Sequence, residues 1–210
     1  MKKIKAVVFD MDGVLIDAKD WHYEALNKAL GLFGYEISRH DHLTTFDGLP
    51  TKKKLEMLSM ERNLPKALHG FINEMKQAYT MQIVHAKCQP LFIHEYALSK
   101  LKAEGYKLAV ASNSVADSVK LMMEKSHLVH WLDCMLSNQD VKRAKPAPDI
   151  YIEAAKRLGV DPQECLVIED NTNGIASATA AGANLLIVRD VADVNYKNIR
   201  NRINEIEAQK

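Results

Sequence analysis

Two carboxylates that could do chemistry, Asp10 and Asp12, stand directly after a short apolar run at residues 6–9. The run has the length and composition of a strand buried on both faces. Asp10 and Asp12 are two residues apart, so on an extended backbone their side chains lie on the same face and can share one ligand. Two unit charges about 4 Å apart repel each other by about 4 kcal/mol at an effective dielectric constant of about 20, so such a pair usually binds a cation or shares a proton. Taken alone, the stretch fits an acidic turn equally well.

Three more polar clusters follow later in the chain. Ser112 offers a hydroxyl group and nearby backbone N–H groups that suit a phosphate oxygen. Lys145, before a predicted helix, can neutralise a carboxylate and a phosphate together, and Glu169 with Asp170 forms a second acidic pair. Each cluster alone has an ordinary alternative: a turn serine, a solvated lysine, or a charge pair at a helix N-terminus. Because they fall in order at predicted strand ends, we interpret them as one site, whose oxygen ligands favour Mg²⁺.

The segments that position these residues alternate between strand and helix from residue 91 onward. Short aliphatic runs predict strands, and amphipathic stretches that stop near glycine predict helices. Short connections imply parallel strands joined by right-handed crossovers. The predicted fold class is therefore α/β, with a doubly wound, Rossmann-like parallel sheet that binds ligands at the carboxyl ends of its strands. The predicted strands are 6–9, 108–111, 134–137, 166–168 and 185–188, and the predicted helices include 115–125, 149–158, 174–181 and a tail helix over 194–210.

Residues 18–82 interrupt this alternation, because their apolar positions recur only at helical spacing. We predict an α/β core from residues 1–17 plus 83–210 and an inserted all-helical cap from 18–82. Within the insert, Thr51 is expected to be the N-cap of a helix that follows Pro50. A core of fewer than about 70 residues rarely supplies much stability alone. The insert is therefore expected to lean on the main domain and to move against it as a hinged lid.

Composition narrows the classes of partner. The 210-residue chain carries a formal net charge of +1, which gives no reason to expect nucleic acid or an anionic membrane as a partner. No apolar run approaches the roughly 20 residues that span a bilayer. Residues 1–5 lead into an apolar run too short for the core of a signal peptide. We therefore expect a cytoplasmic protein that is a monomer or a weak homo-oligomer.

Four motifs in this chain resemble those of the haloacid dehalogenase superfamily. They occur in the order DMDGVLID, SNS, KPAPDIY and EDNTNGI followed by AAGA. The resemblance covers nearly the whole chain and points to the branch with a helical C1 cap after the first motif, which includes β-phosphoglucomutase and many sugar-phosphate phosphatases. It implies a Rossmann-like core, magnesium-dependent chemistry at phosphate, and a small phosphorylated metabolite as partner.

Carried over to this sequence, the resemblance implies that Asp10 is the nucleophile and Asp12 the general acid/base. Ser112 and Lys145 would bind the transferring phosphoryl group, with Asn113 beside them. Covalent aspartyl-phosphate chemistry divides one difficult displacement into two easier ones. Because a carboxylate and a phosphate repel each other, such a site needs both a cation and a lysine.

The resemblance also implies a Mg²⁺ site. Asp10, the backbone carbonyl of Asp12, and Asp170 would bind the ion, with Glu169 as an additional or outer ligand. His22 matches a histidine at the hinge of the cap, which would contact the substrate. As an alternative, His22 is an ordinary histidine on a helix surface.

The acceptor of the phosphoryl group decides the reaction class. Water gives a phosphatase, which we favour, and a sugar hydroxyl gives a β-phosphoglucomutase-like mutase, which is the alternative. The cap arginine and lysine of the mutase fall on Thr51 and Met81 in this chain, although the lysines at 52–54 could substitute. A third interpretation is a regulatory protein that keeps this fold but has no catalytic activity. Its usual sign is the loss of a motif residue, and Asp10 and Lys145 are both present.

Overall fold

The computed structural model describes residues 3–46 and 48–208, and its centre is a parallel five-stranded sheet. The strands lie in the order β3-β2-β1-β4-β5, and each neighbouring pair is parallel. The first strand therefore lies in the middle of the sheet, and the predicted doubly wound α/β fold is confirmed. The strands are β1 Ala6–Phe9, β2 Lys107–Ala111, β3 Cys134–Leu136, β4 Cys165–Glu169 and β5 Asn184–Ile187.

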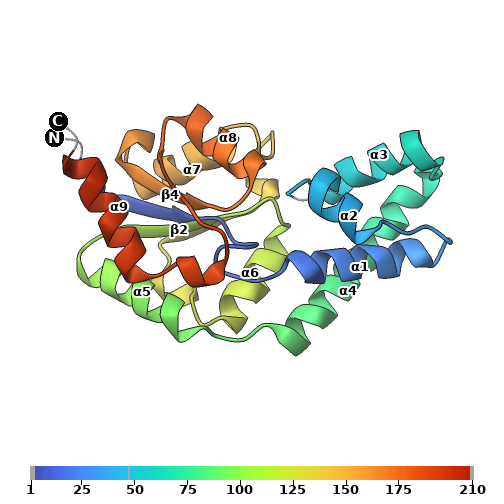
Figure 1. Ribbon diagram of the computed structural model, residues 1–210, viewed down its shortest axis with the longest axis horizontal. Helices are drawn as coiled ribbons and strands as arrows, with labels where there is room; N and C mark the ends of the chain where they lie inside the picture. Colours follow the sequence, from blue (N-terminus) through green and yellow to red (C-terminus); the bar gives the residue numbers. More distant parts are fainter. Residues whose placement is uncertain (1–2, 47, 209–210) are drawn as a thin grey trace. The chain divides into compact units, whose positions relative to one another are not determined.

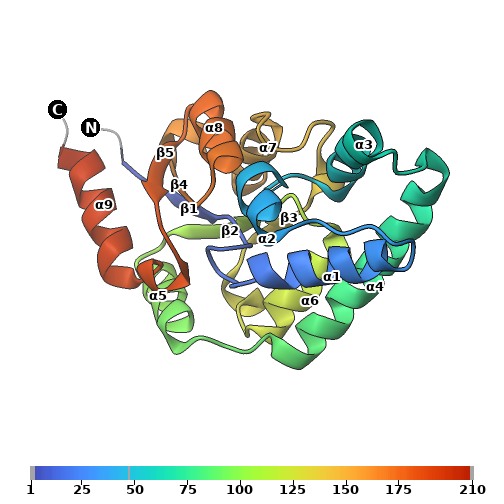
Figure 2. The same cartoon turned by 45° about the vertical axis from the view of Figure 1, so that its right-hand side comes forward.

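Helices cover both faces of the sheet (Figure 1, Figure 2). Two of them, α7 and α8, lie on one face, where they pack against small aliphatic side chains of β1, β2 and β4. The other face is covered by α5, α6 and α9. Because both faces are covered, the central strands are almost wholly apolar until they reach their carboxyl ends. These helices are α5 Phe92–Ala103, α6 Ala116–Lys125, α7 Asp149–Leu158, α8 Thr172–Ala181 and α9 Tyr196–Ala208.

Several predicted bounds agree closely with the structure. The helix predicted over 149–158 is found there as α7, and it ends at Gly159, whose φ of 65° is the left-handed conformation that favours glycine. The predicted tail helix is α9, which buries three isoleucines at helical spacing, and residues 209–210 of that prediction lie outside the described residues. Periodicity alone therefore placed the apolar face of this helix.

Residues Ala18–Cys88 form a second compact unit, separate from the unit of Met1–Asp17 and Gln89–Lys210. Its described residues contain helices and no strand. Its own core joins residues of α1, α3 and α4 with the π-helical segment between α2 and α3. The helices are α1 Lys19–Gly31, α2 Arg39–Asp41, the π-helix His42–Phe46, α3 Thr51–Arg62 and α4 His69–Lys87, with a short 3₁₀ turn at Lys66–Leu68.

Two details of the insert differ from the sequence-based prediction. The structure divides at Cys88, six residues after the predicted boundary at residue 82, because α4 continues to Lys87. The assignment of Thr51 as an N-cap was wrong, since Thr51 is the first helical residue and Pro50 occupies the cap position. The carbonyl of Pro50 accepts the backbone N–H of Lys54 at 3.2 Å, so the helix starts directly after it.

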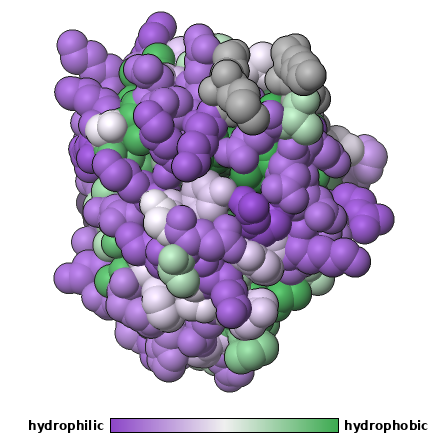
Figure 3. All heavy atoms as spheres, turned by 90° about the vertical axis from the view of Figure 1, so that its left-hand side faces the viewer, coloured by the Kyte–Doolittle hydropathy of each residue, from purple (hydrophilic) through white to green (hydrophobic). Residues whose placement is uncertain are grey.

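Among the described residues, no helix combines the length and the apolar character that crossing a bilayer requires. The surface of the α/β unit near α9 carries mainly hydrophilic side chains, and hydrophobic ones form only small separate areas there (Figure 3). The expected cytoplasmic location and the expected monomer or weak homo-oligomer stay predictions.

Candidate active site

The polar clusters converge at the carboxyl ends of β1, β2 and β4. Asp10 follows β1, and its backbone N–H donates to the carbonyl of Ile168 in β4 at 2.9 Å. Ser112 follows β2, and its N–H donates to the carbonyl of Leu136 in β3 at 3.0 Å. Glu169 is the last residue of β4. Strand pairing therefore brings these three side chains to one edge of the sheet, as their positions after apolar runs predicted.

Lys145 reaches this edge from the loop before α7, and its ammonium group is buried there. The ammonium donates to Asp10 Oδ1 at 2.6 Å, to Glu169 Oε1 at 2.7 Å and to the carbonyl of Ala111 at 2.9 Å. The side chain is only 3% exposed. An ammonium group has three donors, so all three are in use. Contact with a phosphate oxygen would therefore require Lys145 to share or exchange one of these bonds.

Burial and neighbouring charges shift the pKa values of Asp10 and Lys145. The pKa of Asp10 is raised well above its usual range, first because the carboxyl is buried and then because Glu169 repels its charged form, while Lys145 opposes both effects. Burial alone would lower the pKa of Lys145, but attraction to Asp10 and Glu169 outweighs it and the pKa is raised. The geometry thus favours the charged form of Lys145, which lies between the carboxyl groups of Asp10 and Glu169.

Asn113 holds the loop that carries Lys145. Its side-chain oxygen accepts the backbone N–H of Lys145 at 3.0 Å, and its side-chain nitrogen donates to the Lys145 carbonyl at 3.3 Å. The backbone carbonyl of Asn113 accepts from the side chain of Asn138 at 2.9 Å. The side chain of Asn113 therefore holds the backbone of Lys145 in place, and its contact with phosphate stays a prediction.

Glu169 is fully buried, and four donors reach its carboxylate. The ammonium of Lys145 and the hydroxyl of Tyr151 donate to Oε1 at 2.7 and 2.5 Å. The backbone N–H of Asp170 and the side-chain amide of Asn171 donate to Oε2, each at 3.2 Å. A carboxylate offers about four acceptor positions. Glu169 is thus saturated by protein donors, which fits a role outside the direct ligands of a cation.

Three carboxylates form an acidic group suited to a cation. Oxygen atoms of Asp10, Glu169 and Asp170 lie within 4.8 Å of one another. With Lys145, the group has a net formal charge of −2, from three carboxylates and one ammonium. An all-oxygen donor set with this charge fits a hard divalent cation such as Mg²⁺ better than zinc. Because Glu169 is saturated, Asp10 and Asp170 are the side chains best suited to bind it.

Asp12 follows Asp10 by two residues, and its charge is one of the causes that raise the pKa of Asp10. The Oδ2 atom of Asp12 accepts from the hydroxyl of Ser114 at 2.9 Å, and its side chain is not among the three described carboxylates that cluster. The strand ends at Phe9 and the chain then turns, with Gly13 at a φ of 88°. That Asp10 and Asp12 share one ligand stays a prediction. Ser112 orders the neighbouring turn, because its hydroxyl oxygen accepts the N–H of Ser114 at 3.0 Å.

His22 belongs to the unit formed by residues 18–88. Its Nδ1 lies 3.4 Å from the ammonium of Lys76 within that unit. Its proposed contact with a substrate stays a prediction.

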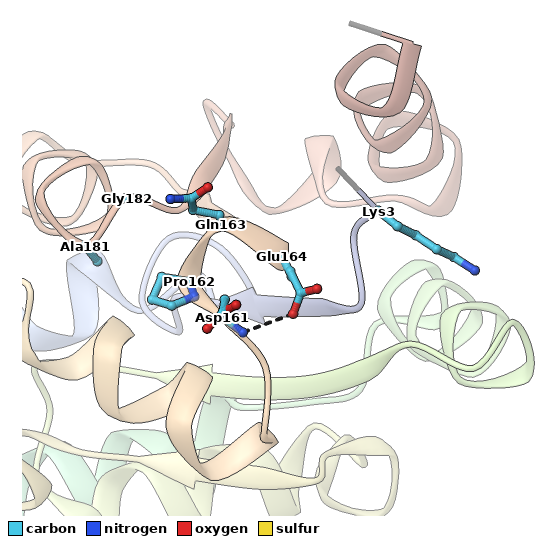
Figure 4. A pocket seen from close by; sticks show the side chains of 7 residues that line it. All are labelled: Lys3, Asp161, Pro162, Gln163, Glu164, Ala181 and Gly182. Atoms are coloured by element: carbon cyan, nitrogen blue, oxygen red, sulfur yellow. Dashed lines mark hydrogen bonds between the residues drawn. The ribbon is translucent and has the colours of Figure 1, made fainter. Parts of the chain in front are cut away.

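A hollow of about 580 Å³ lies at the opposite, amino-terminal ends of the strands (Figure 4). Asp161 and Glu164 line it, and the N–H of Asp161 donates to Glu164 at 3.1 Å. Glu164 also pairs with Lys5 at 2.6 Å. This hollow therefore lies at the opposite end of the strands from Asp10, Ser112 and Glu169.

Comparison with known proteins gives the family. The family described as haloacid dehalogenase-like hydrolase matches residues 7–188, which include each of the motif residues described above. The chain is a haloacid dehalogenase-like hydrolase. The resemblance of its motifs to this superfamily is confirmed, and the protein is accordingly an enzyme of the phosphohydrolase class.

Several relatives of this hydrolase are named as phosphatases. It is 28% identical to the fructose-1-phosphate phosphatase of Escherichia coli, over 90% of this chain and 98% of that protein. It is 30% identical to a probable pseudouridine-5′-phosphatase of Drosophila melanogaster, over 90% of this chain and 84% of that protein. The crystal structure of β-phosphoglucomutase from Clostridium difficile superposes with a TM-score of 0.85 at 22% identity, over 98% of this chain and 100% of the other. This last similarity shows the shared fold.

Sequence reasoning gave no role to three residues of this hydrolase's site. Tyr151 and Gly174 lie against Glu169, and Ser114 lies against Asp12. Each stands inside a motif, in KPAPDIY, EDNTNGI and SNS. Their place in the motifs was visible in the sequence, but their partners are set by tertiary contacts.

Proposed function

We propose that this hydrolase is a magnesium-dependent phosphatase that acts on a small phosphorylated metabolite, with a sugar phosphate as the favoured class, through an aspartyl-phosphate intermediate. The observation that carries the proposal is the buried contact of 2.6 Å between Asp10 Oδ1 and the ammonium of Lys145 at the carboxyl edge of the sheet. The name of the fructose-1-phosphate phosphatase relative supports the substrate class.

In the first step, Asp10 attacks the phosphorus atom. Lys145 holds Oδ1, so we assign Oδ2 as the attacking atom. A new bond forms between Oδ2 and phosphorus, and the bond from phosphorus to the ester oxygen of the substrate breaks. Asp12 donates a proton to that leaving oxygen, as a general acid. The ammonium of Lys145 offsets the repulsion between nucleophile and phosphate, which amounts to a few kcal/mol per pair of charges.

In the second step, water attacks the phosphorus of the aspartyl-phosphate. Asp12, now a carboxylate, accepts a proton from the water, and the bond between phosphorus and Asp10 breaks to release phosphate. The hydroxyl of Ser114 orients Asp12 through its bond of 2.9 Å to Oδ2. A sugar hydroxyl in place of water would make the enzyme a mutase. The named sequence relatives described above are phosphatases, which favours water.

We further propose that Asp10, Asp170 and the backbone carbonyl of Asp12 hold Mg²⁺, with Glu169 outside its direct ligands. The ion, when bound, supplies positive charge that draws the phosphate to the nucleophile. The formal charge of −2, summed over Asp10, Glu169, Asp170 and Lys145, supports a divalent cation there.

We propose as well that residues 18–88 act as a cap that selects the substrate by its non-phosphate part. His22 and the lysines at 52–54 are the candidate contacts within this unit. We expect closure of the cap to exclude bulk water.

A panel of phosphorylated metabolites tests the proposal. The wild-type chain is incubated with each compound and MgCl₂, and released phosphate is measured, with Asp10→Asn as the matched inactive control. Fructose 1-phosphate and other sugar phosphates should release phosphate. The same panel includes β-glucose 1-phosphate with a catalytic amount of its bisphosphate. Steady formation of glucose 6-phosphate without released phosphate would contradict the phosphatase assignment and favour the mutase.

A further inference from the structure

Tyr151 lies in the first turn of α7, and its buried side chain packs beside Lys145. Its side chain is 2% exposed and belongs to the core cluster between α7 and the sheet. Its hydroxyl donates to Glu169 Oε1 at 2.5 Å, and the ammonium of Lys145 lies 4.8 Å from the centre of its ring. Tyr151 therefore contacts both Glu169 and Lys145, which form a buried ion pair, although neither proposed chemical step uses the tyrosine.

The hydroxyl of Tyr151 and the ammonium of Lys145 share one oxygen atom, Glu169 Oε1. Lys145 in turn is shared between Glu169 and Asp10, at 2.7 and 2.6 Å. If the hydroxyl were absent, Oε1 would lose one of these two donors and attract the ammonium more strongly. The contact between Lys145 and Asp10 would weaken as a result.

The carboxylate of Glu169 is also confined from the side of α8. A Cβ atom added at Gly174 would overlap the carboxyl carbon and both oxygens of Glu169. The glutamate therefore fills the space that the glycine leaves, and it has no room to shift towards α8. The direction of its hydrogen bonds to Lys145 and Tyr151 is fixed by this packing.

We infer that Tyr151 is a positioning residue for phosphoryl transfer: its hydroxyl holds Glu169 so that Lys145 remains shared with the nucleophile, Asp10. The inference rests on the proposed function. It adds a neutral hydroxyl donor to the four charged side chains at the sheet edge, and it explains why a tyrosine hydroxyl is buried at this point of α7. Phenylalanine would fill the same space but could not hold the glutamate.

The test compares Tyr151→Phe with the matched control Tyr106→Phe. The hydroxyl of Tyr106 accepts from Arg200 Nη1 at 2.6 Å and lies in the same α/β unit, without contact to the site residues. With p-nitrophenyl phosphate and saturating MgCl₂, Tyr151→Phe should lower kcat at least tenfold, which corresponds to about 1.4 kcal/mol, and should change KM less than twofold. Tyr106→Phe should leave both constants near wild-type values. A kcat for Tyr151→Phe within twofold of wild type would overturn the inference.

A second pair of variants separates positioning from a general effect on folding. Glu169→Asp shortens the side chain and moves its carboxylate away from the tyrosine hydroxyl. If Tyr151 acts through Glu169, adding Tyr151→Phe to Glu169→Asp should lower kcat less than twofold further. An equal tenfold loss in both backgrounds would contradict the inference, and melting temperatures of all four proteins show whether each is folded at the assay temperature. Absence of phosphate release by the wild-type enzyme from any monoester would instead contradict the proposed function.

Discussion

Replacing Gly174 by alanine adds one methyl group at the point where α8 passes the carboxylate of Glu169. In the structure, that methyl group would overlap the carboxyl group, so the glutamate must move. Its buried bonds to Lys145 and Tyr151 would then break or lengthen. Disrupting a buried ion pair costs roughly 3–5 kcal/mol, while alanine gains about 1 kcal/mol over glycine inside a helix. We therefore expect the free energy of unfolding to fall by about 2–4 kcal/mol.

Urea denaturation followed by circular dichroism measures this change, and phosphate release measures its effect on turnover. We expect Gly174→Ala to lower kcat by about a hundredfold or more, since the shared lysine loses its fixed position. Gly70→Ala is the matched control, because Gly70 is also helical and has no atom within 4 Å of an added Cβ. It should be as stable as wild type or slightly more stable. If Gly174→Ala behaved like Gly70→Ala in both assays, the close fit between Glu169 and α8 would be refuted.

Three further predictions concern the metal, the cap and pH. Chelation with EDTA should abolish phosphate release, and added MgCl₂ should restore it; hydrolysis that survives complete chelation would exclude the proposed cation. Lys52→Ala and Lys53→Ala should change KM and substrate preference more than kcat, measured across the metabolite panel, and unchanged preference would argue against their role in specificity. The pKa of buried His94 lies below its usual 6.5, because burial outweighs its bonds to backbone carbonyls. The unfolded chain therefore binds this proton first, so the stability that His94 contributes is present above about pH 6.5 and is lost as the pH falls through the folded-state pKa. Urea midpoints measured from about pH 7.5 down to about pH 5 should fall less steeply in His94→Gln than in wild type, and equal slopes would contradict this assignment.

Much of the fold followed from local pattern. The apolar run before Asp10 predicted a central strand, and the structure places β1 in the middle of the sheet. The glycine at 159 likewise predicted the end of α7, where it adopts the left-handed conformation. The helical spacing of three isoleucines predicted the buried face of α9. These features depend on residues close in sequence, which is why sequence patterns predict them.

The features that escaped prediction depend on how side chains pack in three dimensions. The hydrogen bond between Tyr151 in α7 and Glu169 in β4 joins residues 18 positions apart in the sequence. Gly174 looks like an ordinary helical glycine until its packing against Glu169 is seen.

The central claim is that Asp10 carries the phosphoryl group between the two steps. Acid quenching of the enzyme during turnover, followed by protease digestion and mass spectrometry of the peptides, tests it most directly. We predict a phosphorylated peptide whose modified residue is Asp10, present with substrate and MgCl₂ and absent in Asp10→Asn, which should remain folded and release no phosphate. Hydrolysis by Asp10→Asn at close to the native rate would contradict the account.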